Sequence, residues 1–126
     1  ERASRLVADL GSGGPIYATS FESPDLASDR DWDLIVNCTT LGMRHSEGAN
    51  DLPIPPDWII PGSLICDIVY NPLETPLLRE AERRGARTLS GISMLVYQGA
   101  EAFELWTGRE APLPVMFQAA RQALVA

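Results

Sequence analysis

The chain of 126 residues contains no lysine, one histidine, two cysteines and no long apolar run. A membrane-spanning helix needs roughly 18 or more consecutive apolar residues, so no span is expected. The ten basic residues, all arginine, are outnumbered by seventeen acidic residues, and the net charge is −7. Nucleic-acid binding requires a basic patch that neutralises phosphates, so this class of partner is not expected either.

The chain is also poor in groups that move protons or hold metals. His45 lies alone in a polar loop, where a histidine is usually solvent-exposed and without a role. No Cys-x-x-Cys or Cys/His spacing suggests a metal site. Cys38 and Cys66 lie in apolar, strand-like runs, which predicts two buried thiols in a reducing, cytoplasmic compartment. We therefore expect no metal and no catalytic residue within this chain.

Apolar periodicity and turn residues predict that helices and strands alternate. The expected helices cover residues 1–10, 76–84, 92–107 and about 113–125, and the expected strands cover residues 15–21, 32–40, 63–70 and 86–91. The unbroken apolar centre of the strand at 32–40 is typical of a strand buried on both faces. This alternation predicts an α/β domain with a parallel sheet, which binds ligands beyond the carboxyl ends of its strands.

The segment "GSGGP" (residues 11–15) resembles a dinucleotide-binding loop only superficially. That fingerprint needs Gly-x-Gly-x-x-Gly between a strand and a helix, whereas these glycines follow a predicted helix and precede a predicted strand. The third glycine is missing as well. We interpret the segment as a helix stop and a turn.

Polar side chains follow the predicted strands at the carboxyl edge of the sheet. In "NCTTLGM", the side chains of Asn37, Thr39 and Thr40 have two open interpretations, namely hydrogen bonding to a cofactor or satisfying backbone groups where the strand ends. Tyr70 ends the strand "DIVY", where a phenol packs on the sheet more often than it binds a ligand. Gln98 lies near the start of the helix at 92–107 and suits a hydroxylated ligand, although a helix glutamine is usually solvated.

Three segments together resemble a known family. "DLIVNCTTLGM", "CDIVYNPLETPLL" and "GISMLVYQGAEAFELWTG" occur in an order and at spacings similar to the carboxy-terminal, cofactor-binding half of shikimate dehydrogenases and the related quinate/shikimate dehydrogenases. The resemblance implies a partial Rossmann-like domain over residues 1–126. It also implies NADP-dependent, reversible reduction of 3-dehydroshikimate to shikimate in aromatic amino-acid biosynthesis. Use of NAD, a preference for quinate and a non-catalytic binding module remain alternatives.

The resemblance also implies roles for individual residues. Tyr70 and Gln98 would bind the substrate, shikimate or 3-dehydroshikimate. Arg2 would lie near the adenosine 2′-phosphate, although the Asn-Arg-Thr segment that precedes this arginine in the family is absent. The residues implied at the nicotinamide end of the cofactor are Thr39, Ile68, Gly91, Met94 and Leu95.

The same resemblance predicts that the chain is part of a longer enzyme and is inactive alone. The family's glycine-rich loop, the strand before it and the substrate domain with its catalytic lysine and aspartate would all precede Glu1. The sheet would lack its first strands and leave one edge unpaired. The last helix, at about 113–125, would pack toward the substrate domain. The sequence does not predict an oligomeric state.

Overall fold

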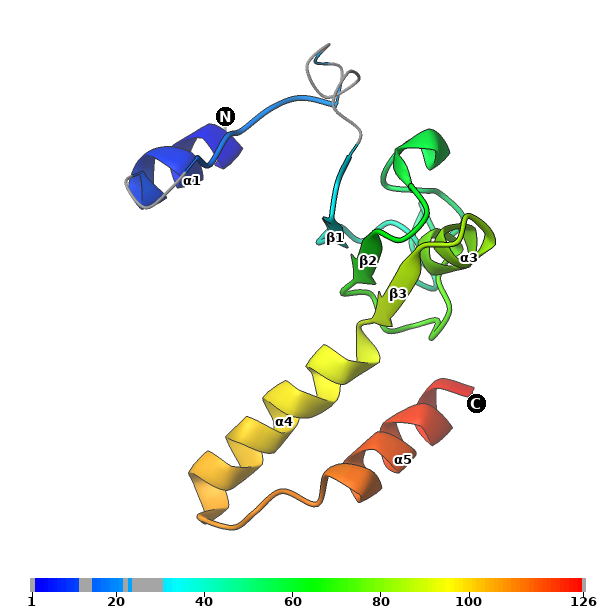
Figure 1. The fold of residues 1–126 in the computed structure, drawn as a ribbon. Helices are drawn as coiled ribbons and strands as arrows, with labels where there is room; N and C mark the ends of the chain where they lie inside the picture. Colours follow the sequence, from blue (N-terminus) through cyan, green and yellow to red (C-terminus); the bar gives the residue numbers. More distant parts are fainter. Residues whose placement is uncertain (1, 12–14, 22, 24–30, 126) are drawn as a thin grey trace. The chain divides into compact units, whose positions relative to one another are not determined.

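The computed structural model describes residues 2–11, 15–21, 23 and 31–125 (Figure 1). These residues form two compact units that divide between Asp31 and Trp32. The first unit contains helix α1 (Arg2–Leu10), and the second contains a parallel sheet and the remaining helices. Residues 12–14, which belong to the predicted glycine turn, lie outside the described residues.

Helix α1 confirms the first predicted helix, but the strand expected next is not present. Every side chain of α1 is at least partly exposed, including the apolar residues Leu6 and Leu10. Residues 15–20 adopt no regular structure, and Tyr17 is 82% exposed. The prediction of a strand over 15–21 was therefore wrong. A β-strand needs a neighbour that pairs with its backbone groups, and no described strand pairs with this segment.

The sheet of the second unit has three parallel strands in the order β1-β2-β3. They are β1 (Leu34–Asn37), β2 (Leu64–Asp67) and β3 (Arg87–Ser90). The register places Asn37, Asp67 and Ser90 side by side at the carboxyl ends. The predicted parallel α/β arrangement is confirmed, although β1 and β2 are shorter than predicted.

At the end of β1 and of β2, the side chain of the last strand residue forms a hydrogen bond that turns the chain. The Asn37 Oδ1 atom accepts a hydrogen bond from the Thr39 backbone N–H at 3.0 Å. The Asp67 Oδ1 atom accepts one from the Val69 backbone N–H at 3.0 Å. Asn and Asp favour such turns because their short side chains bond to the backbone two residues further on. These bonds compete with strand pairing, which explains why both strands end earlier than apolar content suggests.

Helix α3 (Pro76–Arg83) covers one face of the sheet. Thr75 caps it by accepting a hydrogen bond from the Leu78 backbone N–H at 3.3 Å, and Pro76 occupies the first helical position, as predicted. Leu77, Leu78 and Ala81 are the buried residues of this helix and are at most 3% exposed. The left-handed conformation of Gly85, with φ 78°, follows the helix end.

The opposite face of the sheet remains uncovered within residues 32–125. Leu34, Val36 and Leu89 are 43–53% exposed, so the prediction that β1 is buried on both faces was wrong. The prediction of two buried thiols was also wrong, because Cys38 is exposed and Cys66 is half-buried. Apolar residues show that a strand face can be buried. Whether it is buried depends on which elements pack against that face.

The long Gly/Pro-rich segment at residues 41–63 contributes to the core. It contains the short 3₁₀ helix η1 (Pro56–Trp58) and buries Ile54, Trp58 and Ile59 to between 2% and 8% exposure. These side chains anchor a connection that would otherwise be too long for a compact domain.

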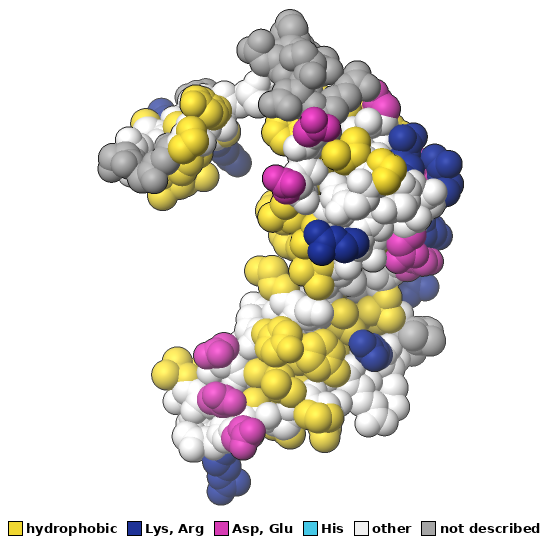
Figure 2. All heavy atoms as spheres, viewed as in Figure 1, with side chains coloured by type: hydrophobic (Ala, Val, Ile, Leu, Met, Phe, Trp, Pro, Cys, Tyr) yellow, Lys and Arg dark blue, Asp and Glu magenta, His cyan; other side chains and the backbone are white. Residues whose placement is uncertain are grey.

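Helices α4 (Ile92–Thr107) and α5 (Leu113–Val125) have the predicted bounds and pack along each other (Figure 1). Tyr97 and Phe117 meet edge to face, with ring centroids 5.6 Å apart. Gly108 ends α4 in the left-handed conformation, with φ 64°. Hydrophobic side chains still gather on the surface of this helix pair, where Leu105 and Trp106 are more than 80% exposed (Figure 2).

Candidate functional site

A small hollow lies where the chain leaves β2 and where α4 begins. Its volume is about 200 Å³. It is lined by Ile68, Tyr70, Gly91, Met94, Leu95 and Gln98. These six residues are all among those that the sequence singled out, and we call this cavity the β2–α4 hollow. Segments more than twenty residues apart thus converge at the carboxyl edge of the sheet, where parallel sheets bind ligands.

Gly91 allows the two walls of this hollow to approach each other. A Cβ atom at this position would collide with the carbonyl oxygens of Ile68 and Val69. Any larger residue would therefore push α4 away from the segment that follows β2. Gly91 also stands at the N-cap position of α4, where no side chain caps the helix. The first N–H groups and the positive end of the helix dipole thus lie beside the hollow.

A second hollow, with a volume of about 340 Å³, adjoins the first because Ile68 and Tyr70 line both. We call it the β1–β2 hollow, since the segments that follow these strands form it. The other residues that line it are Cys38, Thr39, Thr40, Met43, Arg44, Val69 and Asn71. The structure therefore brings Thr39 next to the predicted substrate and nicotinamide residues.

The polar groups after β1 have different accessibility. Asn37 is only 4% exposed and uses its amide for internal hydrogen bonds, so it satisfies the strand end and does not face a ligand. The Thr39 hydroxyl donates to Asn37 Oδ1 at 2.7 Å and accepts from the Leu41 backbone N–H at 3.1 Å. Thr39 is nevertheless exposed and lines the β1–β2 hollow. Its hydroxyl retains only one free acceptor position, which limits what it can offer a ligand.

The charge around the two hollows differs from that of the chain as a whole. The chain has a net charge of −7, yet no described Asp or Glu lines either hollow. Arg44 lines the β1–β2 hollow, and its backbone N–H donates to the Asn71 carbonyl oxygen at 2.8 Å. Sequence reasoning did not select Arg44 or Asn71. Their positions directly after "NCTTLGM" and "DIVY" were the available signal, because residues that follow strands in a parallel sheet gather at one edge.

Arg2 belongs to the first unit, and its predicted role at a 2′-phosphate stays a prediction. Among the described residues, no group of three or more His, Cys, Asp or Glu side chains is placed to hold a metal ion. No described helix is long and apolar enough to cross a membrane.

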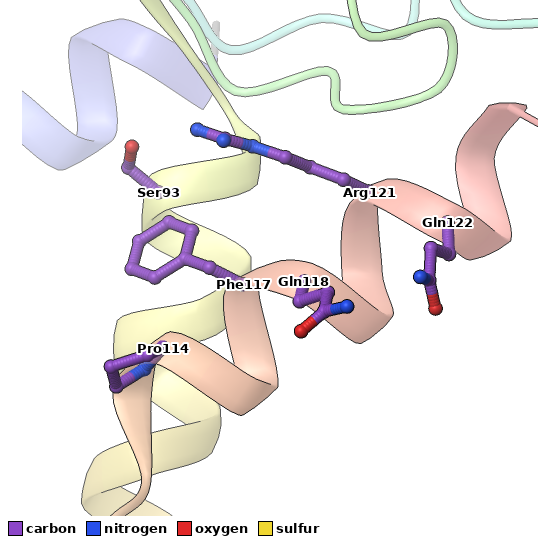
Figure 3. A pocket seen from close by; sticks show the side chains of 6 residues that line it. All are labelled: Ser93, Pro114, Phe117, Gln118, Arg121 and Gln122. Atoms are coloured by element: carbon purple, nitrogen blue, oxygen red, sulfur yellow. The ribbon is translucent and has the colours of Figure 1, made fainter.

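A third hollow, with a volume of about 620 Å³, lies between α4 and α5 (Figure 3). Its lining includes Ser93 at the start of α4, and Phe117 and Arg121 on α5. The Arg121 guanidinium carbon lies 5.9 Å from the centroid of the Phe117 ring. None of the residues that line this hollow is buried, and none was predicted to bind a ligand. We therefore assign the candidate site to the two hollows at the strand ends.

Comparisons with known proteins identify the family to which the chain belongs. A family model for the shikimate 5′-dehydrogenase C-terminal domain matches residues 91–121. The chain is 45% identical over 127 residues to an NADP(+) shikimate dehydrogenase from Moorella thermoacetica, covering 98% of this chain and 42% of that protein. It is 52% identical over 130 residues to the enzyme of the same name from Methanosarcina acetivorans, covering 100% of this chain and 45% of that protein.

A solved structure gives the same result. Shikimate 5-dehydrogenase from Thermus thermophilus, in complex with NADP(H) and shikimate, matches with a TM-score of 0.79 and 36% identity, covering 98% of this chain and 42% of that one. The chain is therefore part of a Rossmann-like α/β domain. It belongs to the shikimate dehydrogenase family and matches the carboxy-terminal part of its members. It spans less than half the length of these relatives.

Proposed function

We propose that this chain is the cofactor-binding part of an NADP-dependent shikimate dehydrogenase, which reversibly reduces 3-dehydroshikimate to shikimate. The observation that carries the proposal is the β2–α4 hollow, in which six residues assigned from the resemblance lie together. Relatives with this name support both the reaction and the choice of cofactor. The reaction belongs to aromatic amino-acid biosynthesis. The two free thiols are consistent with a reducing compartment, and we place the protein in the cytoplasm.

The chemistry of the two hollows fits the nicotinamide end of the cofactor. The side chains of Ile68, Met94 and Leu95 and the bare backbone of Gly91 offer an apolar surface for a flat ring. Thr39 would contribute from the adjoining hollow, and the lack of described acidic residues there avoids repulsion of the cofactor phosphates. In its reduced form, the cofactor would supply the hydride. Ile68, Gly91, Met94 and Leu95 would hold the nicotinamide and orient it.

Tyr70 and Gln98 would bind the substrate beside the nicotinamide. Tyr70 is 42% exposed and lines both hollows, so its phenol is available to a ligand. Gln98, on α4, lines the β2–α4 hollow and can both donate and accept hydrogen bonds. These groups suit the carboxylate and hydroxyls of shikimate. Arg2 would read the adenosine 2′-phosphate, a role that rests on the resemblance alone.

Substitution of the two polar residues tests the proposed function in the complete gene product. Shikimate-dependent reduction of NADP is measured. Tyr70→Phe and Gln98→Ala should each lower kcat/KM by a factor that corresponds to about 1–3 kcal/mol of transition-state stabilisation, because each removes a hydrogen-bond partner. Tyr17→Phe and Gln118→Ala are the matched controls, since Tyr17 is 82% exposed and neither residue has a proposed role in ligand binding. Turnover of quinate with NAD, without turnover of shikimate, would contradict the proposed substrate.

We also propose that residues 1–126 cooperate with a separate substrate domain, toward which α5 packs. The partly exposed apolar surface of α4 and α5 supports this arrangement, since Tyr97 and Val115 are 54% and 62% exposed. The family's pyrophosphate-binding loop is not part of this sequence, so the isolated chain should bind NADP weakly or not at all. Isothermal titration calorimetry checks this expectation. A micromolar dissociation constant for the isolated chain would contradict it.

A further inference from the structure

Three buried polar side chains meet where β1 and β2 end and where α3 begins. Asp67 and Thr75 are 0% exposed and Asn37 is 4% exposed. We call these three residues the strand-end network. Burial of polar groups costs free energy unless hydrogen bonds replace those to water, so a network of this kind requires a specific arrangement. It is located directly behind the segments that form the two strand-end hollows.

Asp67 is the centre of the network. Its Oδ1 atom accepts hydrogen bonds from Asn37 Nδ2 and from the Val69 backbone N–H, both at 3.0 Å. Its Oδ2 atom accepts a hydrogen bond from the Thr75 hydroxyl at 2.6 Å. One carboxylate therefore connects the end of β1, the segment after β2 and the cap of α3. Three donors satisfy this buried group, which is the condition for keeping it inside the protein.

Asn37 extends the network to the segment that follows β1. Its Oδ1 atom accepts from the Thr39 backbone N–H at 3.0 Å and from the Thr39 hydroxyl at 2.7 Å. Its Nδ2 group donates to the Leu41 carbonyl oxygen at 3.3 Å as well as to Asp67. The side chain therefore fixes both the conformation of Thr39 and the path of the chain beyond it.

The two segments held by the network are the walls of the candidate site. Residues 38–44 and 68–71 contribute every residue of the β1–β2 hollow, and 68–71 also supply Ile68 and Tyr70 to the β2–α4 hollow. We propose that Asp67, acting through Asn37 and Val69, is a positioning residue that sets the separation of these walls. It does not touch the ligand. The inference rests on the proposed function and assigns a role to Asp67, which lies within the segment "CDIVYNPLETPLL" but lines neither hollow.

A purely structural role would produce a different result, and the chain offers a matched control. Asp67 also supports α3 through Thr75, so its loss destabilises the fold. Leu77 is 1% exposed on the same helix and takes no part in the network, so Leu77→Ala destabilises α3 by leaving a cavity. Asp67→Asn retains an oxygen for Val69 and Asn37 and is the conservative variant. Asp67→Ala removes all three acceptor interactions.

The experiment measures steady-state kinetics and amide hydrogen exchange in the complete gene product, at a temperature where each variant is folded. Asp67→Ala should raise KM for both NADP and shikimate and lower kcat/KM by about 10-fold to 100-fold, because a buried partner is lost. Amides of residues 38–44 and 68–71 should exchange faster. Asp67→Asn should stay within about threefold of wild type, since it keeps one acceptor oxygen. Leu77→Ala should leave both KM values unchanged.

If Asp67→Ala does not fold, Asn37→Ala decides the question, because exchange should then accelerate in residues 38–44 more than in 68–71. Unchanged exchange in these segments, or equal effects of Asp67→Ala and Leu77→Ala on KM, would overturn the inference. A wild-type protein without shikimate-dependent NADP reduction would contradict the proposed function instead. The exchange measurements would still decide whether the network positions the two walls.

Discussion

The two faces of the three-stranded sheet carry similar aliphatic side chains in opposite surroundings. On one face, Ile65 is 0% exposed beside α3. On the other face, Val36 and Leu89 are 43% and 44% exposed. Both residues pair with Cys66, which directly follows Ile65 in β2. The difference arises from connectivity, because the right-handed crossover from β2 to β3 places α3 on one face only. The second face has an apolar surface without a described cover.

The comparison predicts that equivalent truncations have unequal effects on stability. Ile65→Ala should lower the free energy of unfolding by about 2–4 kcal/mol, because it removes buried methyl groups and leaves a cavity beside α3. Leu89→Ala should lower it by less than about 1 kcal/mol, because the side chain is already in contact with solvent. Urea denaturation of the chain measures both values.

Ile65→Ala also removes a β-branched side chain, but the whole scale of β-propensity spans only about 1 kcal/mol, so propensity alone does not produce a difference of about 2 kcal/mol or more. Equal losses for Ile65→Ala and Leu89→Ala would show that the second face is covered. The same pair in the complete gene product would then identify the source of that cover. If the cost of Leu89→Ala is larger there than in the chain, segments outside residues 1–126 cover the face.

Local sequence signals predicted most elements of the fold. Thr75 and Pro76 marked the start of α3, and Gly108 marked the end of α4, because caps depend on backbone chemistry within one turn. The exposure of one face of β1 and of Cys38 was not predictable in the same way. They depend on which other segments pack against the strand, and hydrophobicity records only the capacity for burial.

In the candidate site, too, some features were predictable from the sequence and others depended on how segments pack. Parallel strands bring their carboxyl ends to one edge, so the convergence of Tyr70, Gly91 and Gln98 follows from the order of elements together with the resemblance. The internal use of Asn37 could not be read from the sequence, which left cofactor binding and strand-end satisfaction open. Only the register that places Asn37 beside Asp67 decides between them.

The different exposure of the two cysteines predicts their relative rates of alkylation. Cys66 is half-buried in β2, and burial raises the pKa of its thiol, with further contributions from the neighbouring charges of Asp67 and Cys38. A raised pKa leaves less thiolate at a given pH, so iodoacetamide should alkylate Cys66 several times more slowly than the exposed Cys38. Peptide mass spectrometry over a time course checks this order. Faster alkylation of Cys66 would contradict the partial burial of this side chain.

The smallest expected effect lies on the outer side of α3, the helix that distinguishes the two faces. Arg83 and Arg84 donate hydrogen bonds to the Glu80 carboxylate, at distances of 2.6–2.8 Å, and lower its pKa from 4.5 to about 2. A folded-state pKa below the unfolded value stabilises the fold above about pH 4.5, and this contribution is lost as the pH falls toward 2. Glu80→Gln should therefore be slightly less stable than wild type at pH 7. Urea denaturation should show this difference shrinking below pH 4.5 and, because the Arg83 side chain is exposed, in high salt. A difference that persists at pH 2 would mean that Glu80 acts through packing and not through its charge.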